Sequence, residues 1–429
     1  MSVAAVFEQV PTSPPAVRRA NDDSIESFRW DEAASTIVRT VRARSGAEVE
    51  SRIHSMSPKS KDLAAEFDAA WIRASERPKL PGSIDVQFAD LFAGCGAMSI
   101  GVVEACRALG KTAHPMFAAD MNRKALDVYQ ANFTPRRSSS DPIEHDLDSP
   151  IGSALSNKER TLKRRVGAID LVIGGPPCQG NSDLNNHTRR SDPKNALYLR
   201  MVRFAEVFDP STIIIENVRG VLHDRNNVTG VAQEALERLG YTVEVLVIPG
   251  EDIGVPQRRR RVFLLASTGK LRPLGEELAR YRQPSRSFAW ACGDLVKSTA
   301  HPLLDATGKP SATNKRRIDY LFDNDCFDLP NNERPSCHRD KAHSYNSVYG
   351  RMRWGEPAPT ITTGFGSMGQ GRFVHPKQRR TITPREAARL QFIPDFFSFG
   401  DANRAAIAEM IGNAVPPKMA YVAALHLLR

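Results

Sequence analysis

The sequence predicts an α/β fold with a parallel sheet and a second, smaller and irregular domain. From Val86 onward, short β-rich runs alternate with amphipathic helical stretches, a pattern typical of strands joined by right-handed crossovers. The pattern ends near Ser267, where Pro, Gly, Asn and basic residues replace the apolar runs. A length of 429 residues also exceeds one typical hydrophobic core, which favours two domains.

The predicted elements follow from this alternation. Strands are expected at residues 86–92, 115–119, 169–173, 212–215, 241–248 and 261–266. Helices are expected between them at residues 124–132, 196–208 and 231–239, and elsewhere at residues 61–74 and 419–428. A further helix should begin at Thr383, because Thr383 and Glu386 form a capping box and Pro384 occupies the first helical position.

Composition limits the class of protein. Lys and Arg number 59 against 49 Asp and Glu, and the net charge of +10 suits a polyanionic partner, although a basic proteome or a solvated face would give the same excess. Six cysteines without short paired spacings favour a reducing compartment over a disulfide framework. Residues 1–20 lack the apolar run of a signal peptide, and no run is long enough to span a bilayer. We expect a cytoplasmic protein.

Ligands of open α/β sheets bind beyond the carboxyl ends of the strands, so the residues that follow each predicted strand are the candidates for a site. The first strand leads into Gly94 and Gly96, which permit a tight turn and close approach by a ligand. Ser99 replaces the third glycine of the dinucleotide fingerprint, so a purely structural turn is an equal alternative. Asp120 follows the second strand and could accept hydrogen bonds from ribose hydroxyls, or instead cap the next helix.

The third predicted strand leads into the segment GGPPCQG, which contains Cys178. Two prolines stiffen the approach and the glycines free the backbone, so the thiol should lie at a loop tip. The alternative, a buried inert cysteine, would normally lie inside an apolar run. A nucleophilic thiolate needs cationic or dipolar surroundings, which the many arginines of the chain could provide.

The fourth strand ends at Glu216, and the sixth begins with Gln257 and four arginines. A carboxyl that emerges from an apolar strand is poorly solvated, which raises its pKa and suits a proton donor; a salt-bridged loop carboxylate is the alternative. Because strand residues alternate between faces, Gln257, Arg259 and Arg261 should point one way and Arg258 and Arg260 the other. The run could form an anion or base-carbonyl site, a solvated face or a plain phosphate contact.

Seven segments, taken in order, resemble the DNA cytosine-5 methyltransferase family. They are DLFAGCG from Asp90, Asp120 itself, GGPPCQG around Cys178, ENV from Glu216, QRRRR from Gln257, TPREAARLQ from Thr383 and IGNAVPP from Ile411. The resemblance covers most of residues 86–429 and implies a Rossmann-like, S-adenosylmethionine-dependent methyltransferase sheet with a target recognition domain.

The resemblance also implies a mechanism. Cys178 would add to carbon 6 of a cytosine, and the resulting enamine would attack the cofactor methyl group. Glu216 would donate a proton or hydrogen bond at N3, while Arg259 and Arg261 would contact the base oxygen and organise the nucleophile. The expected S-adenosyl-L-methionine contacts are Phe92, Gly94, Gly96, Asp120, Met121, Asp146, Leu147, Pro177 and Asn413.

The chain is expected to divide into four segments, of which the resemblance covers the last three. Residues 1–80 would be a partly disordered appendage, a partner-binding or DNA-contacting arm, and residues 81–266 the catalytic and cofactor-binding domain. Residues 267–376 would read bases in the major groove of double-stranded DNA, and they include a threonine-bearing segment at Thr360–Gly364 that resembles family recognition domains. Residues 377–429 would return to the catalytic domain, since Asn413 is expected at the cofactor.

The segment after Cys178 would cover the flipped base. Its candidate lid residues are Asn181, Asn185, Asn186, Arg189 and Arg190. Many relatives carry an aromatic residue where this chain has Asn181, so loop closure should differ here while the chemistry is retained.

Other interpretations stay open at this stage. A tRNA cytosine-5 methyltransferase would keep the same motifs, although the long recognition segment favours DNA. A non-catalytic DNA-binding regulator would not need Cys178, Glu216 and both arginines. Cys326, Cys337, His338 and His343 could hold zinc, but without a short cysteine pair we expect ordinary packing and no metal site.

The biological setting can be predicted only in outline. Enzymes of this kind most often protect host DNA in a restriction-modification or other anti-phage system, with a cognate restriction endonuclease or other defence component as partner. We expect a nucleoid-associated monomer, and the sequence does not reveal which DNA sequence it recognises.

Overall fold

The computed structural model describes residues 24–55, 57–80, 85–177, 197–224, 227–297, 301–339 and 348–429. Several predicted residues lie outside these ranges. They are Cys178, the lid residues Asn181, Asn185, Asn186, Arg189 and Arg190, and His343, while Cys337 is described in its backbone alone.

A seven-stranded sheet in the order β6-β5-β4-β7-β8-β11-β9 forms the centre of the molecule. Its strands are β4 (Val86–Leu91), β5 (Ala113–Ala119), β6 (Arg137–Ser139), β7 (Leu171–Gly174), β8 (Thr212–Asn217), β9 (Thr242–Pro249) and β11 (Arg260–Ser267). All six predicted strands are confirmed, and the short β6 was not predicted. The fully buried runs in β7, β8 and β11 reflect a sheet that is covered on both faces.

The prediction of a purely parallel sheet is wrong at one strand. β11 runs antiparallel to both of its neighbours, β8 and β9. Only ten residues, 250–259, separate β9 from β11, and they hold no crossover helix. A parallel connection needs a crossover of a dozen or more residues, so a short link of this kind returns the chain antiparallel.

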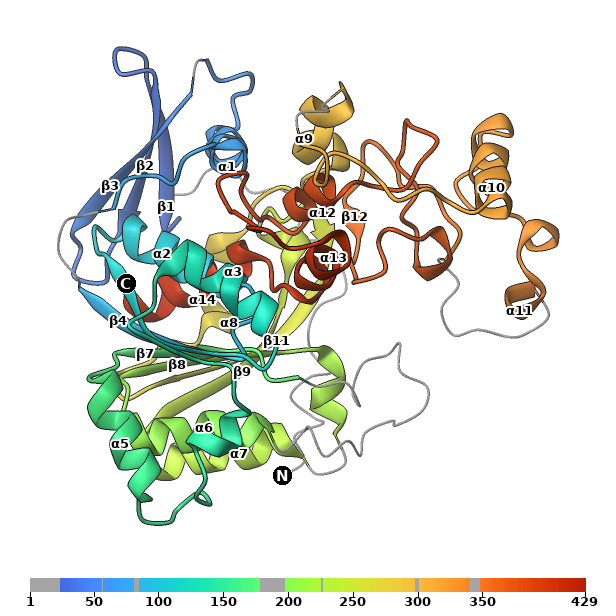
Figure 1. The fold of residues 1–429 in the computed structure, drawn as a ribbon. Helices are drawn as coiled ribbons and strands as arrows, with labels where there is room; N and C mark the ends of the chain where they lie inside the picture. The colour runs from blue at the N-terminus through green and yellow to red at the C-terminus, as the bar shows by residue number, and fades with distance from the viewer. Residues whose placement is uncertain are drawn as a thin grey trace.

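Helices cover both faces of the sheet, as Figure 1 shows. On one face lie α5 (Asn157–Val166), α6 (Tyr198–Phe208) and α7 (Val228–Arg238). On the other lie α2 (Ala97–Ala108), α3 (Arg123–Phe133) and the C-terminal α14 (Pro417–Leu428). The predicted helices at 124–132, 196–208, 231–239 and 419–428 are confirmed within a few residues. Because α14 packs along α2, the chain returns to this sheet after the irregular segment.

The N-terminal segment contains a small sheet that was not predicted. The antiparallel strands β1 (Glu26–Asp31), β2 (Thr36–Arg42) and β3 (Glu48–His54) precede the predicted helix, α1 (Leu63–Arg73). Charged residues alternate with apolar ones in β1 and β3, and that two-residue period is the signal that would have identified them, whereas β2 lacks it.

Buried charges join this N-terminal segment to the main sheet. Arg39 on β2 is 2% exposed and pairs with Glu104 on α2 at 2.9 Å. Asp68 on α1 accepts hydrogen bonds at 2.8 and 3.1 Å from Nζ of Lys418, which lies at the start of α14. Buried charges are retained where a partner compensates their desolvation, so these pairs fix the N-terminal segment to α2 and α14.

Residues 267–376 start beside β9, where Glu244 accepts hydrogen bonds from Leu274 N and Gly275 N, and their later part extends to one side of the sheet (Figure 1). They contain the helices α8 (Leu274–Glu277), α9 (Phe288–Cys292), α10 (Ala312–Asp323) and α11 (Ser336–Arg339). A separate small apolar cluster includes Ile318, Leu329 and Val374. The strand β12 (Ala358–Pro359) pairs with β10 (Gln257–Arg258), which joins this segment to the sheet at the start of β11.

Three shorter helices complete the chain: α4 (Ile143–Asp146), α12 (Pro384–Leu390) and α13 (Arg404–Asn413). The predicted capping box is confirmed at α12, where Thr383 Oγ1 accepts from Glu386 N and Glu386 Oε2 accepts from Thr383 N.

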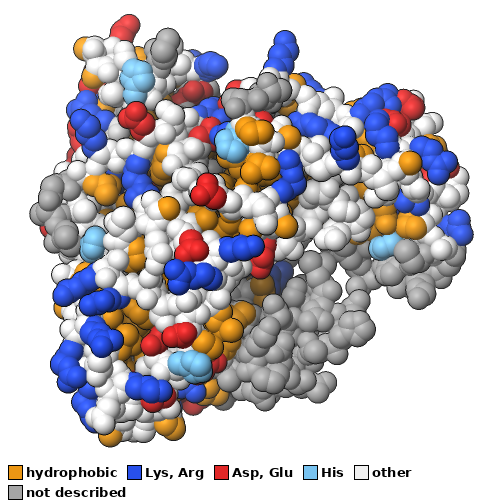
Figure 2. All heavy atoms as spheres, in the orientation of Figure 1, with side chains coloured by type: hydrophobic (Ala, Val, Ile, Leu, Met, Phe, Trp, Pro, Cys, Tyr) orange, Lys and Arg blue, Asp and Glu red, His pale blue; other side chains and the backbone are white. Residues whose placement is uncertain are grey.

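Basic side chains are dispersed over the face seen in Figure 2, including the regions of α5 and α10. Within the described part of the chain, every helix is too short or too polar to cross a membrane.

The buried Lys418–Asp68 pair gives a stability test. Asp68→Ala should lower the free energy of unfolding by about 3–5 kcal/mol, because the Lys418 ammonium would stay buried without its partner. The double variant Asp68→Ala with Lys418→Met should recover a large part of that loss in denaturant titrations. Glu50→Ala is the control, since its pairs with Arg29 and Arg52 are exposed and should contribute about 1 kcal/mol or less. A loss for Asp68→Ala as small as that control would contradict the role of the pair.

Candidate active site

A cavity of about 2100 Å³ lies beyond the carboxyl ends of the strands, where open α/β sheets bind ligands. Its wall combines loops after β4, β5, β7 and β8 with the start of β11, part of the irregular segment and the end of α13. The structure brings nine predicted residues together in this wall: Phe92, Gly94, Asp120, Met121, Pro177, Glu216, Arg259, Arg261 and Asn413.

The turn after β4 opens toward the cavity. Phe92 and Gly94 both have positive φ angles, of 58° and 54°. Apart from its chain neighbours, no described atom lies within 4 Å of the position that a Gly94 Cβ would take. Asp120 holds this turn, since its carboxylate accepts from Gly94 N and from Asn122 N, both at 2.7 Å. Asn122, not Asp120, is the N-cap of α3, so the capping alternative for Asp120 is wrong.

Gly96 has a different local role from Gly94. It has a φ of 94°, and a Cβ there would lie 2.5 Å from Phe133 Cε2 and 2.8 Å from Tyr129 Cδ2. Gly96 therefore lets the turn pack against α3, and it is absent from the described cavity wall.

Asp146 and Leu147 are also absent from the described wall, although Ile143 and Glu144 of the same short helix belong to it. Asp146 Oδ2 is buried and has no hydrogen-bond partner among the described residues. Contact of either residue with a cofactor stays a prediction.

Ser99, which breaks the glycine fingerprint, belongs to a buried polar chain beside the turn. Its hydroxyl lies 2.7 Å from Asp90 Oδ2 and 2.9 Å from the Tyr129 hydroxyl. Burial raises the pKa of Asp90 to about 8, and the charge of Asp120 adds to the effect. Sequence reasoning treated Ser99 only as a departure from a motif and missed this chain.

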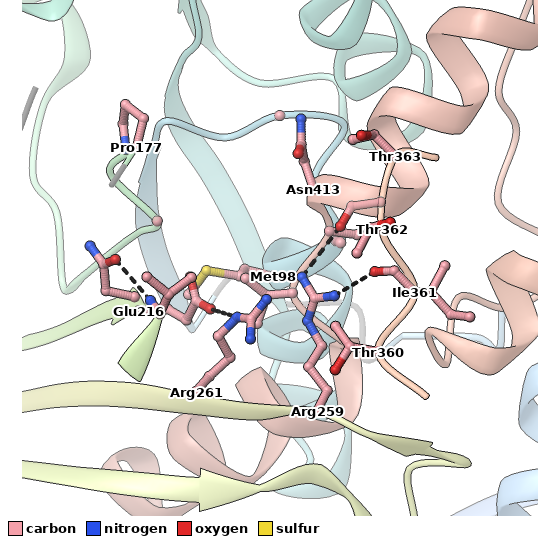
Figure 3. A pocket seen from close by; sticks show the side chains of 18 of the residues that line it. Met98, Pro177, Glu216, Arg259, Arg261, Thr360, Ile361, Thr362, Thr363 and Asn413 are labelled. Carbon is pink, nitrogen blue, oxygen red and sulfur yellow. Dashed lines mark hydrogen bonds and ion pairs between the residues drawn. The ribbon is translucent and has the colours of Figure 1, made fainter. Parts of the chain in front are cut away.

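Glu216 and Arg261 form a buried pair in the cavity, at the edge of the sheet. Arg261 Nε lies 2.9 Å from Glu216 Oε1, and Figure 3 shows the two side chains pointing toward each other. Burial raises the pKa of Glu216, while Arg261 and Arg259 act in the opposite direction. The raised pKa predicted for Glu216 is confirmed. The salt-bridge partner of the alternative is also present, but Glu216 lies in strand β8 and not in a loop.

The loop that precedes Cys178 is held close to this pair. A Cβ on Gly175 would lie 3.2 Å from Glu216 Oε2, so glycine permits the close approach. Asn217 Nδ2 donates to the Pro176 carbonyl at 3.3 Å, a link that was not predicted. Pro177, the last described residue of the loop, lines the cavity.

Arg259 joins distant segments behind the Glu216–Arg261 pair. It is 3% exposed and donates from Nη1 to the Ile361 carbonyl at 2.8 Å and from Nη2 to the Gly412 carbonyl at 3.3 Å (Figure 3). Gln257 adds a parallel link, since its Oε1 accepts from Ile361 N at 2.7 Å. Arg259 thereby positions both the Thr360–Thr363 loop and the end of α13 at the cavity, and its contact with a base stays a prediction.

The predicted alternation along the arginine run is confirmed. The side chains of Arg259 and Arg261 are buried or nearly so, whereas Arg258 and Arg260 are more than half exposed.

Of the four candidate zinc residues, the side chains of Cys326 and His338 are described. No group of three metal-ligating side chains occurs among the described residues, and the His338 ring packs against Tyr349 with ring centroids 5.3 Å apart.

Comparison with known proteins agrees with the motifs. Residues 86–429 match the family model described as C-5 cytosine-specific DNA methylase. The chain belongs to this family. It is 47% identical over 412 residues to the type II methyltransferase M1.BsuMI of Bacillus subtilis (strain 168), covering 95% of this chain and 96% of that protein. It is 30% identical over 317 residues to the type II methylase M.HgiDII of Herpetosiphon aurantiacus, covering 67% and 88%.

Solved structures confirm the Rossmann-like methyltransferase fold. A DNA modification methyltransferase encoded within an E. coli prophage aligns with a TM-score of 0.54 at 20% identity, covering 80% of this chain and 99% of that one. DNMT2 of Spodoptera frugiperda also gives a TM-score of 0.54, at 15% identity, covering 80% and 100%.

The pKa of Asp90 leads to a pH-dependence prediction. An unfolded aspartate has a pKa near 3.9, so between about pH 4 and pH 8 the folded chain holds a proton that the unfolded chain has released. The stabilising effect of that proton is complete below about pH 4 and is lost as the pH rises toward 8. Asp90→Asn, which keeps an acceptor for Ser99, should therefore lose less stability than the wild type between pH 5 and pH 8.

Denaturant titrations at the two pH values check this, with Asp127→Asn on the exposed side of α3 as the control. An equal pH dependence in the wild type and Asp90→Asn would exclude Asp90 as its source.

Proposed function

We propose that this enzyme is a sequence-specific type II DNA methyltransferase that transfers a methyl group from S-adenosylmethionine to carbon 5 of a flipped cytosine through a covalent bond between Cys178 and carbon 6. The observation that carries the proposal is the buried Glu216–Arg261 pair, 2.9 Å apart, beside the loop that leads to Cys178. The type II designation of M1.BsuMI and M.HgiDII supports the DNA substrate.

The cavity is divided by charge along the order of the strands. Acidic side chains follow β5 and β6 or come from α13: Asp120, Asp141, Glu144 and Glu409. Seven arginines occupy the β8 and β11 end and the irregular segment, where they outnumber the four carboxylates Glu216, Glu251, Asp328 and Glu356: Arg219, Arg258, Arg259, Arg260, Arg261, Arg353 and Arg372. An acidic end suits a cationic ligand, and a basic end suits a polyanion.

The acidic end fits S-adenosylmethionine, whose sulfonium and ammonium groups are cationic. The open space at Gly94 admits a ligand beside the turn, and Asp120 presents carboxylate oxygens to ribose hydroxyls. Met121 is 67% exposed and lines the same end, so it would cover the adenine. Asn413 would contact the methionine part. When bound, the cofactor supplies an electrophilic methyl group.

The residues at the basic end provide the remaining chemistry. A cytosine in duplex DNA is shielded by stacking, so it must leave the helix to enter the cavity. The Cys178 thiolate would form a bond to carbon 6, which makes carbon 5 nucleophilic. Glu216, held by Arg261 and protonated more readily because it is buried, would supply a proton or hydrogen bond at N3. Loss of the carbon 5 proton to a water-assisted base and elimination of Cys178 would release 5-methylcytosine.

The residues of the cavity wall and the names of the relatives also support a proposal for the domains of the chain and for its biological role. Residues 267–376 would be the target recognition domain, because Arg353 and Thr360–Thr363 line the cavity beside the arginines. Residues 81–266 and 377–429 would together form the catalytic domain. The designations of the relatives favour protection of host DNA in a restriction-modification system with a cognate endonuclease.

One experiment tests the proposal. The protein is expressed in a host that lacks cytosine methylation, and the host DNA is sequenced after bisulfite-type conversion, alongside a Cys178→Ala control. We expect 5-methylcytosine in one short sequence motif with the wild type and none with the control. Methylation of tRNA by the wild type without any methylated DNA motif would favour the tRNA alternative, and loss of neither activity in Cys178→Ala would exclude the covalent mechanism.

The role of Glu216 can be measured separately. Glu216→Gln removes the proton but keeps the size of the side chain, so kcat should fall by about 10²- to 10⁴-fold. The Kd values for duplex DNA and cofactor should change little, because the cavity keeps its shape. Glu234→Gln, on the exposed side of α7, is the matched control and should retain full activity. A kcat for Glu216→Gln near that of the control would contradict proton donation by Glu216.

A further inference from the structure

The outward arginines Arg258 and Arg260 have no role in the chemistry of the buried pair. Their side chains are 57% and 55% exposed, whereas those of Arg259 and Arg261 between and beside them are 3% and 14% exposed. All four line the same cavity, so the inward pair lies deep and the outward pair lies at the solvent-facing mouth.

Each outward arginine is paired with a carboxylate from another segment. Arg258 Nη2 lies 2.8 Å from Glu356 Oε2 in the irregular segment, and Arg260 Nη2 lies 3.5 Å from Glu251 Oε1 in the turn after β9. Glu251 Oε2 is buried and has no hydrogen-bond partner within the described residues. Exposed pairs contribute little to stability, and a 3.5 Å pair that leaves a carboxylate oxygen unsatisfied contributes less. Stability alone is therefore a poor explanation for both pairs.

Strand pairing and hydrogen bonds fix the backbone that carries Arg258 and Arg260. Arg258 pairs with Pro359 across β10 and β12, and its carbonyl accepts from Thr360 Oγ1 at 2.8 Å. The Arg259 carbonyl accepts from Gly250 N at 2.8 Å. The two guanidinium groups therefore start from backbone positions that are fixed relative to Arg259 and Arg261.

This placement matters for a nucleotide that enters the cavity. If its base reaches Glu216, its sugar and the two adjoining phosphates must stay toward the mouth, because they remain connected to the rest of the strand. The exposed cations nearest the inward pair along the chain are Arg258 and Arg260. Guanidinium groups bind phosphate through two parallel hydrogen bonds, as they bind carboxylate.

We propose that Arg258 and Arg260 bind the phosphates that flank the flipped cytosine, and that Glu356 and Glu251 hold the two arginines until the phosphates replace the carboxylates. This inference rests on the proposed function, since it requires duplex DNA as the substrate. The glutamates keep the arginines extended at the mouth, and they oppose the binding of DNA that does not bring phosphates to both positions.

The test measures the affinity for duplex DNA, by fluorescence anisotropy, across a series of salt concentrations. The variants are Arg258→Gln, Arg260→Gln and the double variant, with Arg238→Gln as the matched control. Arg238 is also exposed and also paired with a glutamate, but it lies on α7 outside the cavity wall. Each phosphate contact that is removed should lower the slope of log Kd against log salt by about 0.9.

The glutamate variants separate phosphate binding from a structural link between segments. Glu356→Gln and Glu251→Gln should bind DNA at least as tightly as the wild type, because they remove a competing carboxylate and a like charge. Arg258→Lys and Arg260→Lys, which keep the charge, should retain a slope close to that of the wild type. If the pairs were only structural, the arginine and glutamate variants would weaken binding alike and lower the melting temperature together.

The outcomes distinguish this inference from the proposed function. Unchanged slopes in both glutamine variants of the arginines, with salt-dependent binding by the wild type, would overturn the phosphate assignment and leave the methyltransferase proposal intact. A folded wild type that neither binds duplex DNA nor methylates it would overturn the proposed function itself.

Discussion

The cavity depends on the two hydrogen bonds that the guanidinium of Arg259 donates. The open edge of an α/β sheet presents only the strand ends of one domain, and a closed cavity needs walls from elsewhere in the chain. Arg259 supplies that connection from the start of β11, through the carbonyls of Ile361 and Gly412. The two acceptors lie 102 and 153 residues further along the chain, so a single buried side chain fixes the irregular segment and the C-terminal segment against one sheet edge.

The charge division across the cavity follows from the same arrangement. The strand order β6-β5-β4-β7-β8-β11-β9 places the loops after β4, β5 and β6 together and the start of β11 several strands away. Carboxylates without arginines line the first group, whereas the arginines of the wall lie at the second together with Glu216, Glu251 and Glu356, so positive charge is confined to one end of the cavity. The antiparallel β11 contributes to this, because it presents its first residues, not its last, at the carboxyl edge of the parallel strands.

Much of this site could be predicted from local sequence. Glycines in a turn, an acidic residue after a buried strand and alternating arginines are each recognisable from a few neighbouring residues. The structure confirms the alternation of the arginines and the raised pKa of Glu216. Long-range partners could not be predicted in the same way. Nothing in the residues around Ser99 reveals that Tyr129 completes a chain to Asp90, and no local pattern reveals that Lys418 pairs with Asp68. The strands β1 to β3 were not predicted, because residues 1–80 were interpreted as a partly disordered appendage, and the burial of Arg39 against Glu104 on α2 depends on a partner 65 residues away.

Arg259 reaches the irregular segment only through main-chain atoms, and Gln257 does the same at Ile361 N. Main-chain atoms are the same in every residue, so these two links do not depend on which side chain Ile361 carries, unlike the hydrogen bond from Thr360 Oγ1 and the ion pair of Glu356, which both join Arg258. Side chains of the proposed recognition segment can therefore change without loss of these two hydrogen bonds. Under the proposed function, a change in the recognised DNA sequence would leave this connection to the catalytic framework in place.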